Sequence, residues 1–196
     1  MSGRKAVPDE AAVRKLAAAR DPDPRHTAHV TGLSLRLFDA LEAVHRLGPG
    51  ARRLLETAAR LHDIGWSGNP GPGHHKRSRD MILSADIGLD GRGRTMCALI
   101  ARYHTKALPD PERHRRFAGL RGPDRAAVEW LAGILRVADG LDCTHAARVG
   151  IKGCSAGRTR IVIRLRAPAG SVEIDKARRK ADLLRRAAGR AVVLEP

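Results

Sequence analysis

The spacing of apolar residues changes once along this chain, and this change constrains the fold more than any other feature. Up to about residue 145, apolar residues recur at helical intervals, as at Val30, Leu33 and Leu37. Beyond it, branched apolar residues alternate with basic ones, as in RTRIVIRLR over 158–166, which is typical of strands with one exposed face. The sequence therefore predicts a mainly α-helical protein, with a helical domain over 1–145 and a small α+β extension over 146–196 packed on it.

Proline and glycine divide both parts into shorter elements. We expect a second helix that runs from about residue 25 to the GPG sequence at 48–50, and a third that stops at Gly65. The third helix is predicted over 51–63, and a short first helix over 8–20. The remaining helices are predicted over 74–84, 91–104, 125–139 and 175–188, with an irregular connection over 108–124. Strands are predicted within 148–154, 158–166 and 191–194.

The chain is strongly basic. Lys and Arg number 37 against 21 Asp and Glu, which gives a formal net charge of +16. Such a charge attracts phosphorylated metabolites, polyphosphate, nucleic acid or an acidic protein surface, although a general bias toward Arg, Ala and Gly explains the excess equally well. Aromatic residues make up only 3% of the chain, so nucleic acid is not the expected partner.

Nothing in the sequence indicates export or a membrane location. No apolar run approaches the roughly 20 residues that span a bilayer, and the charged N-terminus lacks the continuous apolar core of a signal peptide. Cys97, Cys143 and Cys154 are odd in number and lack CxxC spacing, so we expect reduced, structural thiols. These features together predict a cytoplasmic protein.

Side chains that commonly bind metals stand at the predicted helix ends. They are His26, His62, Asp63, His74, His75, His104 and Asp139. Antiparallel helices in a bundle bring their ends to a common side, where imidazole and carboxylate donors would suit Mn, Fe, Co, Ni or Zn. Each residue alone has an ordinary explanation, such as a helix cap or a buried histidine, but this explanation must hold for all of them at once.

Five segments in order resemble a known family. They are HTAHVTGLSLRLFDAL (26–41), LHDIG (61–65), GHHKRS (73–78), ALIARYHTKALP (98–109) and WLAGILRVADGLD (130–142). Together they resemble the HD-domain superfamily of metal-dependent phosphohydrolases. The closest resemblance is to the HD-like C-terminal domain of the exopolyphosphatase and guanosine pentaphosphate phosphohydrolase (Ppx/GppA) family, and it covers most of residues 25–196. It implies an HD-domain helical bundle.

The resemblance also implies a ligand set for one or two divalent ions, with Mg added to the metals above. His26 rather than His29 matches the first family histidine, and Asp63 is the bridging carboxylate. The implied metal ligands are His26, His62, Asp63, His104 and Asp139, together with His74 or His75. The pattern does not decide between these last two, although His74 is favoured because it precedes the small residue Ser78 by four positions. Arg77 stands where the family often has another histidine.

Four basic residues flank the implied ligands. Lys76 and Arg77 follow the paired histidines, while Arg102 and Lys106 bracket His104. We expect these four to bind phosphate oxygens, and Lys76 and Lys106 to assist Asp63 in catalysis. A solvated basic face is the equally weighted alternative.

The predicted function is that of a metal-dependent phosphohydrolase acting on a phosphorylated small molecule, either a nucleotide or a polyphosphate-like substrate. In long family members, phosphatase chemistry belongs to N-terminal actin-like domains, for which 196 residues leave no room. The alternative is therefore a regulatory or binding module that docks on an actin-like phosphatase partner or holds polyphosphate. A homodimer is compatible with either hypothesis.

Overall fold

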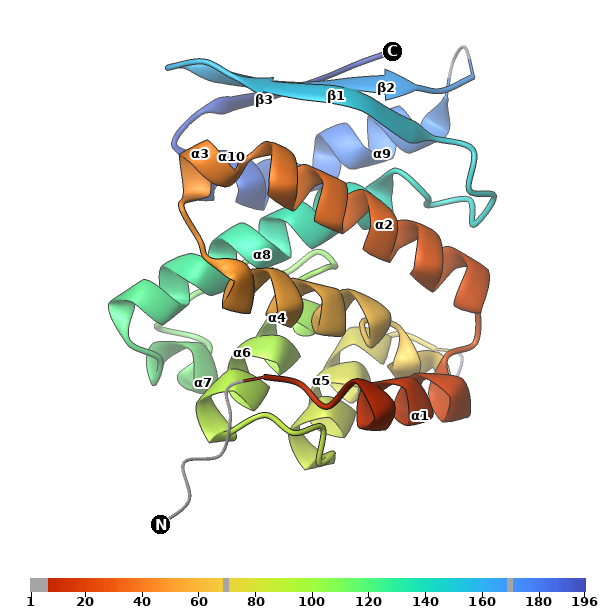
Figure 1. The fold of residues 1–196 in the computed structure, drawn as a ribbon, viewed down its shortest axis with the longest axis vertical. Coiled ribbons are helices and arrows are strands. Elements are labelled where there is room, and N and C mark those ends of the chain that lie inside the picture. Colours follow the sequence, from red (N-terminus) through yellow and green to blue (C-terminus); the bar gives the residue numbers. More distant parts are fainter. Residues whose placement is uncertain (1–6, 69–70, 169–170) are drawn as a thin grey trace.

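The computed structural model of this chain describes residues 7–68, 71–168 and 171–196 (Figure 1). Its helices are α1 (Glu10–Arg20), α2 (Pro24–Ala40), α3 (Glu42–His45), α4 (Pro49–Arg60), α5 (His74–Ser84), α6 (Gly91–Arg102), α7 (Arg115–Ala118), α8 (Gly122–Gly140), α9 (Val172–Lys180) and α10 (Asp182–Ala188). A 3-10 turn, η1, covers Ile64–Trp66, and the strands are β1 (Gly150–Ala156), β2 (Arg160–Arg166) and β3 (Ala191–Glu195). The predicted fold class, mainly α-helical with a small α+β extension, is confirmed.

Helix α8 is the central element of the fold. It packs against α2, α4 and α6 of the bundle, and also against α9 and α10. Two of its glycines permit the second contact: a Cβ on Gly133 would lie 2.9 Å from the Leu184 Cα, and one on Gly140 would lie 2.7 Å from the Ala177 Cα. Because α9 lies so close to α8, the last residue of α9, Lys180, lies near the C-terminal end of α8.

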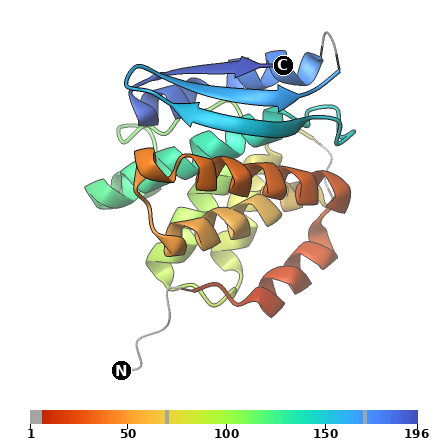
Figure 2. The same cartoon turned by 45° about the horizontal axis from the view of Figure 1, so that its top comes forward.

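The three strands form a sheet that covers one end of the bundle, above α2, α9 and α10 (Figures 1 and 2). β1 pairs with β2 antiparallel, whereas β2 pairs with β3 parallel through the α9–α10 connection. Ile161, Ile163 and Leu165 are all fully buried beneath the sheet. The arginines between and beside them are exposed, as the alternating pattern predicts.

The predicted end of the second helix is wrong. α2 ends at Ala40, and a separate short helix, α3, follows it and ends at His45, after which Arg46 adopts a left-handed conformation with φ 54°. The GPG sequence does not terminate this helix, because Pro49 instead begins α4. Proline suits the first helical position, where its fixed φ is compatible with the helix and its missing N–H is not needed.

The predicted role of Gly65 as a helix stop is also wrong. α4 ends at Arg60, so His62 and Asp63 lie in the turn that follows it. A Cβ on Gly65 would lie 2.2 Å from the His74 carbonyl oxygen and 2.5 Å from the Ser78 nitrogen. This glycine therefore allows α5 to approach the turn that carries His62 and Asp63.

Two smaller differences concern the connections. The predicted helix over 175–188 is divided into α9 and α10 at Ala181, and the connection over 108–124 contains the short helix α7. The start of α8 lies at Gly122, before the predicted residue 125. The division of the chain into domains at residue 145 stays a prediction.

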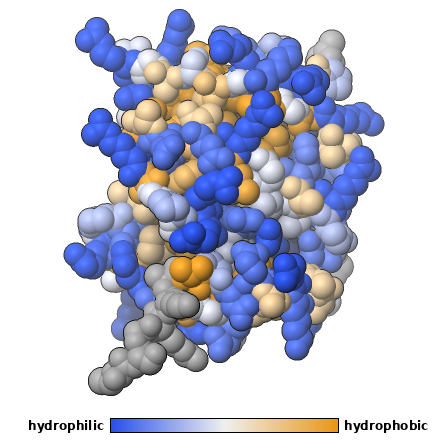
Figure 3. Space-filling view, in the orientation of Figure 1, coloured by the Kyte–Doolittle hydropathy of each residue, from blue (hydrophilic) through white to orange (hydrophobic). Residues whose placement is uncertain are grey.

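Hydrophilic side chains extend over the helices and the sheet on the face drawn in Figure 3, with apolar atoms between them. Among the described residues, no helix combines the length and the apolar character that a membrane crossing requires. Cys97, Cys143 and Cys154 are free, and burial raises the pKa of the Cys97 thiol to about 12. Cys97 therefore stays protonated and unreactive at neutral pH.

Candidate metal centre

The structure brings together six of the residues predicted to bind metal. Each stands at or just beyond the end of a helix: His26 in the first turn of α2, His62 and Asp63 after α4, His74 at the start of α5, His104 after α6, and Asp139 in the last turn of α8. Local caps fix some of these positions. Asp23 accepts a hydrogen bond from the His26 backbone N–H at 3.0 Å, so α2 begins where His26 enters the cluster.

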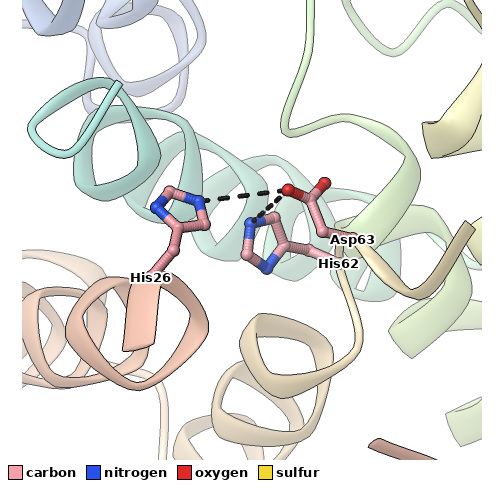
Figure 4. Close-up of side chains that lie close together, drawn as sticks. All are labelled: His26, His62 and Asp63. Atoms are coloured by element: carbon pink, nitrogen blue, oxygen red, sulfur yellow. Dashed lines mark ion pairs between the residues drawn. The ribbon is translucent and has the colours of Figure 1, made fainter. Parts of the chain in front are cut away.

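His26, His62 and Asp63 form the first of two groups with metal-binding geometry (Figure 4). Their side chains point toward one another, with the Asp63 Oδ2 3.9 Å from the His26 Nε2 and 3.6 Å from the His62 Nε2. The Asp139 Oδ1 lies on the same side of the cluster, 3.5 Å from the His26 Nε2 and 3.8 Å from the His62 Nε2.

Asp63, His74 and His104 form the second group. Here the other carboxylate oxygen, the Asp63 Oδ1, lies 3.5 Å from the His74 Nε2 and 3.3 Å from the His104 Nε2. The two imidazole nitrogens are 3.2 Å apart. Asp63 is thus shared, with one oxygen directed at each group.

Three of the histidines are oriented by hydrogen bonds from their second ring nitrogen. The Nδ1 of His26 donates to the Asp142 Oδ2 at 2.9 Å, that of His62 to the Ala59 carbonyl at 2.7 Å, and that of His104 to the Ala101 carbonyl at 2.5 Å. A proton on Nδ1 leaves the lone pair on Nε2, which is the atom directed into the cluster. Such outer hydrogen bonds fix the tautomer and ring orientation of metal-binding histidines.

Burial sets the charge state of the cluster. It lowers the pKa of His62 to about 4, and it also lowers the pKa of His74 to about 4, with His104 contributing in the same direction. Burial alone would raise the pKa of Asp63, but the neighbouring His62, His104 and His74 rings hold this pKa well below its usual range. At neutral pH the cluster therefore presents the ionised carboxylate of Asp63 beside the neutral imidazoles of His62 and His74, which is a state that binds a cation.

The donor set fits a divalent metal. The Nε2 atoms of His26 and His62 are buried and have no hydrogen-bond partner among the described residues. A buried polar atom without a partner destabilises a fold, so these two nitrogens are suited to a bound ion or water molecule. Imidazole nitrogen and carboxylate oxygen are suitable donors for first-row transition metals. The assignment of the individual ligands, Asp139 included, stays a prediction.

The position of His74 favours it over His75 as the metal ligand. His74 reaches Asp63 and His104, and its ring stacks on Trp66 with 4.3 Å between ring centroids and 15° between ring planes. His75 belongs to neither metal-binding group in the described chain, and its ring meets that of His74 edge-on at 5.4 Å.

The four basic residues predicted to bind phosphate differ in their surroundings. The Arg77 guanidinium donates to the carbonyl oxygens of Gly65, Pro72 and Gly71 at 2.7, 3.1 and 3.0 Å, so it supports the loop before α5. Lys106 is exposed. Lys76 and Arg102 line a cavity whose lining includes none of the six clustered residues.

Sequence reasoning missed two charged residues that border the cluster. Asp142 orients His26, and its other carboxylate oxygen accepts from the Ala147 N–H at 2.7 Å. Lys180 donates to the Asp139 Oδ2, so a residue of α9 contacts the centre. The spacing of Asp139 and Asp142 in VADGLD was a usable signal for the first residue, whereas no local pattern marked the second.

Comparison with protein families decides the classification. The sequence model of Ppx/GppA phosphatase, domain III, matches residues 9–181. The chain belongs to this family. The matched region includes the whole candidate metal centre and ends just after Lys180, and it includes β1 and β2 but not β3. No curated protein matches the chain.

Proposed function

We propose that this Ppx/GppA domain III protein is a metal-dependent phosphohydrolase of the HD-domain type. Its substrate would be a phosphorylated small molecule, a nucleotide or a short polyphosphate. The observation that carries the proposal is the position of Asp63, which directs one oxygen at each of two histidine groups. A carboxylate shared in this way would hold two ions close enough to act on the same phosphoryl group.

The cluster divides naturally between two ions. His26, His62 and Asp139 would hold the first, His74 and His104 the second, and Asp63 would bridge them. Divalent ions bound here would polarise a phosphoryl oxygen and lower the pKa of a water molecule toward about 7. The chain itself contributes the ionised carboxylate of Asp63, the neutral imidazoles of His62 and His74, and the Nδ1 hydrogen bonds that orient His26, His62 and His104.

Phosphoryl transfer depends mainly on positioning and on neutralisation of charge, and a rigid cluster at converging helix ends provides both.

The free cysteines and the unreactive Cys97 thiol agree with a reducing compartment, so we also propose a cytoplasmic location.

The test combines metal analysis with an activity screen. Protein purified without chelator is analysed for bound metals, then assayed for phosphate release from nucleotides, cyclic dinucleotides and short polyphosphates with Mn, Fe, Co, Ni, Zn or Mg added. We expect release from at least one substrate, lost in Asp63→Asn and retained in Asp175→Asn, a control at an exposed carboxylate. Failure of the protein to retain any metal after reconstitution would refute the proposal.

A second candidate function rests on the net charge of +16 and on the match to one domain of a larger phosphatase type. In this case the protein is a regulatory or binding module that docks on an actin-like phosphatase or holds polyphosphate. Bound metal without phosphate release from any substrate, combined with stable association with an actin-like phosphatase, would favour this alternative.

A further inference from the structure

The segment over 142–149 joins α8 to β1 and lies against the first two turns of α2; we call it the strap. Both of its ends are hydrogen-bonded to α2. The Asp142 Oδ2 accepts from the His26 Nδ1 at 2.9 Å, and the Val149 carbonyl accepts from the His29 Nε2 at 2.9 Å. The strap therefore lies directly beside one of the predicted metal ligands.

Between these two ends, His145 places its ring on the ring of His26. The ring centroids are 3.9 Å apart and the ring planes differ by 12°, which is a parallel stack. The Nδ1 of His145 donates to the Asp23 Oδ2 at 2.9 Å. The stack and the hydrogen bond together hold an imidazole that is otherwise exposed to solvent.

Asp23 connects His145 to the backbone of His26. Its Oδ1 accepts from the His26 backbone N–H at 3.0 Å and caps α2, while its Oδ2 accepts from the His145 ring. The bond from the His26 N–H, and after it the bond from His145, lower the pKa of the Asp23 carboxyl. One carboxylate thus fixes both the backbone from which His26 projects and the ring that covers it.

The His26 ring is constrained in two directions. A ring N–H donates in the plane of the imidazole, so Asp142 sets the direction in which Nε2 points but still permits the ring to tilt. The His145 ring blocks this tilt on one face, because the stacked rings are already in contact. Functional groups need to be held within about 0.5 Å of their productive position, and the two constraints together supply this for His26.

The backbone of the strap is strained where it carries His145. His145 has φ 58° and Ala147 has φ 53°, in the left-handed region that residues with a Cβ seldom adopt. Such conformations concentrate at functional sites and ligand clamps, where the surrounding contacts hold them in place. The contacts with Asp23 and His26 are the ones that hold His145.

We infer that His145 is a positioning residue, which holds the His26 ring for the ion of the first metal group. The inference rests on the metal centre of the proposed function and does not require hydrolysis. His74 and His104, in the second group, have their ring contacts with residues outside the strap. The ion of the second group should therefore not depend on His145.

The test is calorimetric titration of the metal-free full chain with Co²⁺. His145→Asn keeps a side chain that tolerates the left-handed conformation and donates to Asp23, but it removes the ring. Loss of an outer partner of a metal-binding histidine should weaken the affinity for one ion by about 10- to 100-fold. The affinity for the other ion should change by less than about threefold, since its ligands lie outside the strap. The unfolding temperature of the metal-free variant should match that of the wild type.

A double variant tests whether His145 acts through His26. His26→Gln already removes the ligand, so adding His145→Asn to it should not weaken the remaining ion further. His145→Phe restores an aromatic ring without the hydrogen bond to Asp23, and it should bind the affected ion more tightly than His145→Asn does.

Ala147→Gly is the matched control within the strap. It relaxes the second left-handed residue and retains the N–H that donates to the Asp142 Oδ1 at 2.7 Å. This variant should unfold at the same or a higher temperature than the wild type and bind both ions as the wild type does.

Three results would overturn the inference. Equal weakening of both ions in His145→Asn would indicate a general structural role, and unchanged affinity for every ion would indicate no role. Failure of the wild type to bind Co²⁺ would refute the metal centre and the inference with it. Absence of phosphate release would leave these affinities, and so the inference, unaffected while it counts against the proposed hydrolase.

Discussion

Lys180 donates a hydrogen bond to the Asp139 Oδ2 although 41 residues separate the two in sequence, and so links α9 to the candidate metal centre. Burial and the nearby Arg136 lower the pKa of Lys180, whereas the charges of Asp63 and Asp182 act in the opposite direction. The ammonium occupies one oxygen of Asp139, and the other oxygen faces His26 and His62. Lys180 therefore compensates a carboxylate that a metal ion would also neutralise.

This contact predicts that Lys180 and a metal ion compete to neutralise the Asp139 carboxylate. Lys180→Met should destabilise the metal-free protein by about 3 kcal/mol, the cost of leaving a buried charge unpaired. Added Mn or Zn should then raise the unfolding temperature more in Lys180→Met than in the wild type, because the ion has no ammonium to oppose it. Thermal unfolding with and without metal measures both effects.

Lys176→Met is the matched control, since Lys176 lies on the same helix and is exposed. This control should be close to the wild type in both measurements. An equal metal-induced shift in Lys180→Met and the wild type would contradict a role for Asp139 in metal binding.

Local sequence patterns predicted most of the elements and the helix-end positions of the cluster. His74 opens α5 as expected, and Asp139 lies in the last turn of α8. These predictions succeeded because periodic apolar residues and the turn residues between them are local signals. The turn that carries His62 and Asp63 was wrongly treated as helix, since the close approach of α5 at Gly65 is a tertiary contact.

The residues that surround the cluster were harder to predict. Gly140 lets α9 approach α8 closely enough for Lys180 to contact Asp139, and this tertiary contact is not indicated by the apolar periodicity of either helix. Arg77 stood beside the paired histidines and was expected to bind phosphate, yet its guanidinium donates to loop carbonyls. For a long side chain, sequence position specifies the neighbourhood but not the partner.

Single substitutions should separate the two metal groups. Metal analysis should give about two ions per chain in the wild type if Asp63 bridges them. His26→Gln should leave about one ion, and so should His104→Gln, because each variant removes a ligand from one group only. Asp63→Ala should remove both.

His75→Gln is the control for this series, since His75 adjoins His74 but belongs to neither group. It should retain both ions. A loss of all metal in both His26→Gln and His104→Gln would contradict two separable groups and indicate a single ion.

Gly65 should tolerate no side chain. A Cβ there would meet the His74 carbonyl oxygen at 2.2 Å, so Gly65→Ala must displace α5 and with it His74. We expect a loss of about 3 kcal/mol in the free energy of unfolding, at the upper end for overpacking, and weaker metal binding. Gly32→Ala, in α2 with nothing within 4 Å of the added Cβ, should instead stabilise the protein by about 0.5–1 kcal/mol. Urea denaturation of both variants measures this contrast, and an unaffected Gly65→Ala would contradict the packing of α5 against the turn.

The buried histidines predict how the stability of the metal-free protein depends on pH. The pKa of His62 is lowered to about 4 in the folded state, whereas an unfolded histidine titrates near 6.5. Between these values the unfolded chain binds the extra proton, so stability should fall as the pH is lowered from about 6.5 to 4, by at most about 3 kcal/mol for this group. Urea denaturation in chelator at several pH values measures this slope, which His62→Gln should flatten because the variant has no proton to take up. An unchanged slope in His62→Gln would assign the acid sensitivity to other groups and contradict a neutral imidazole at the centre.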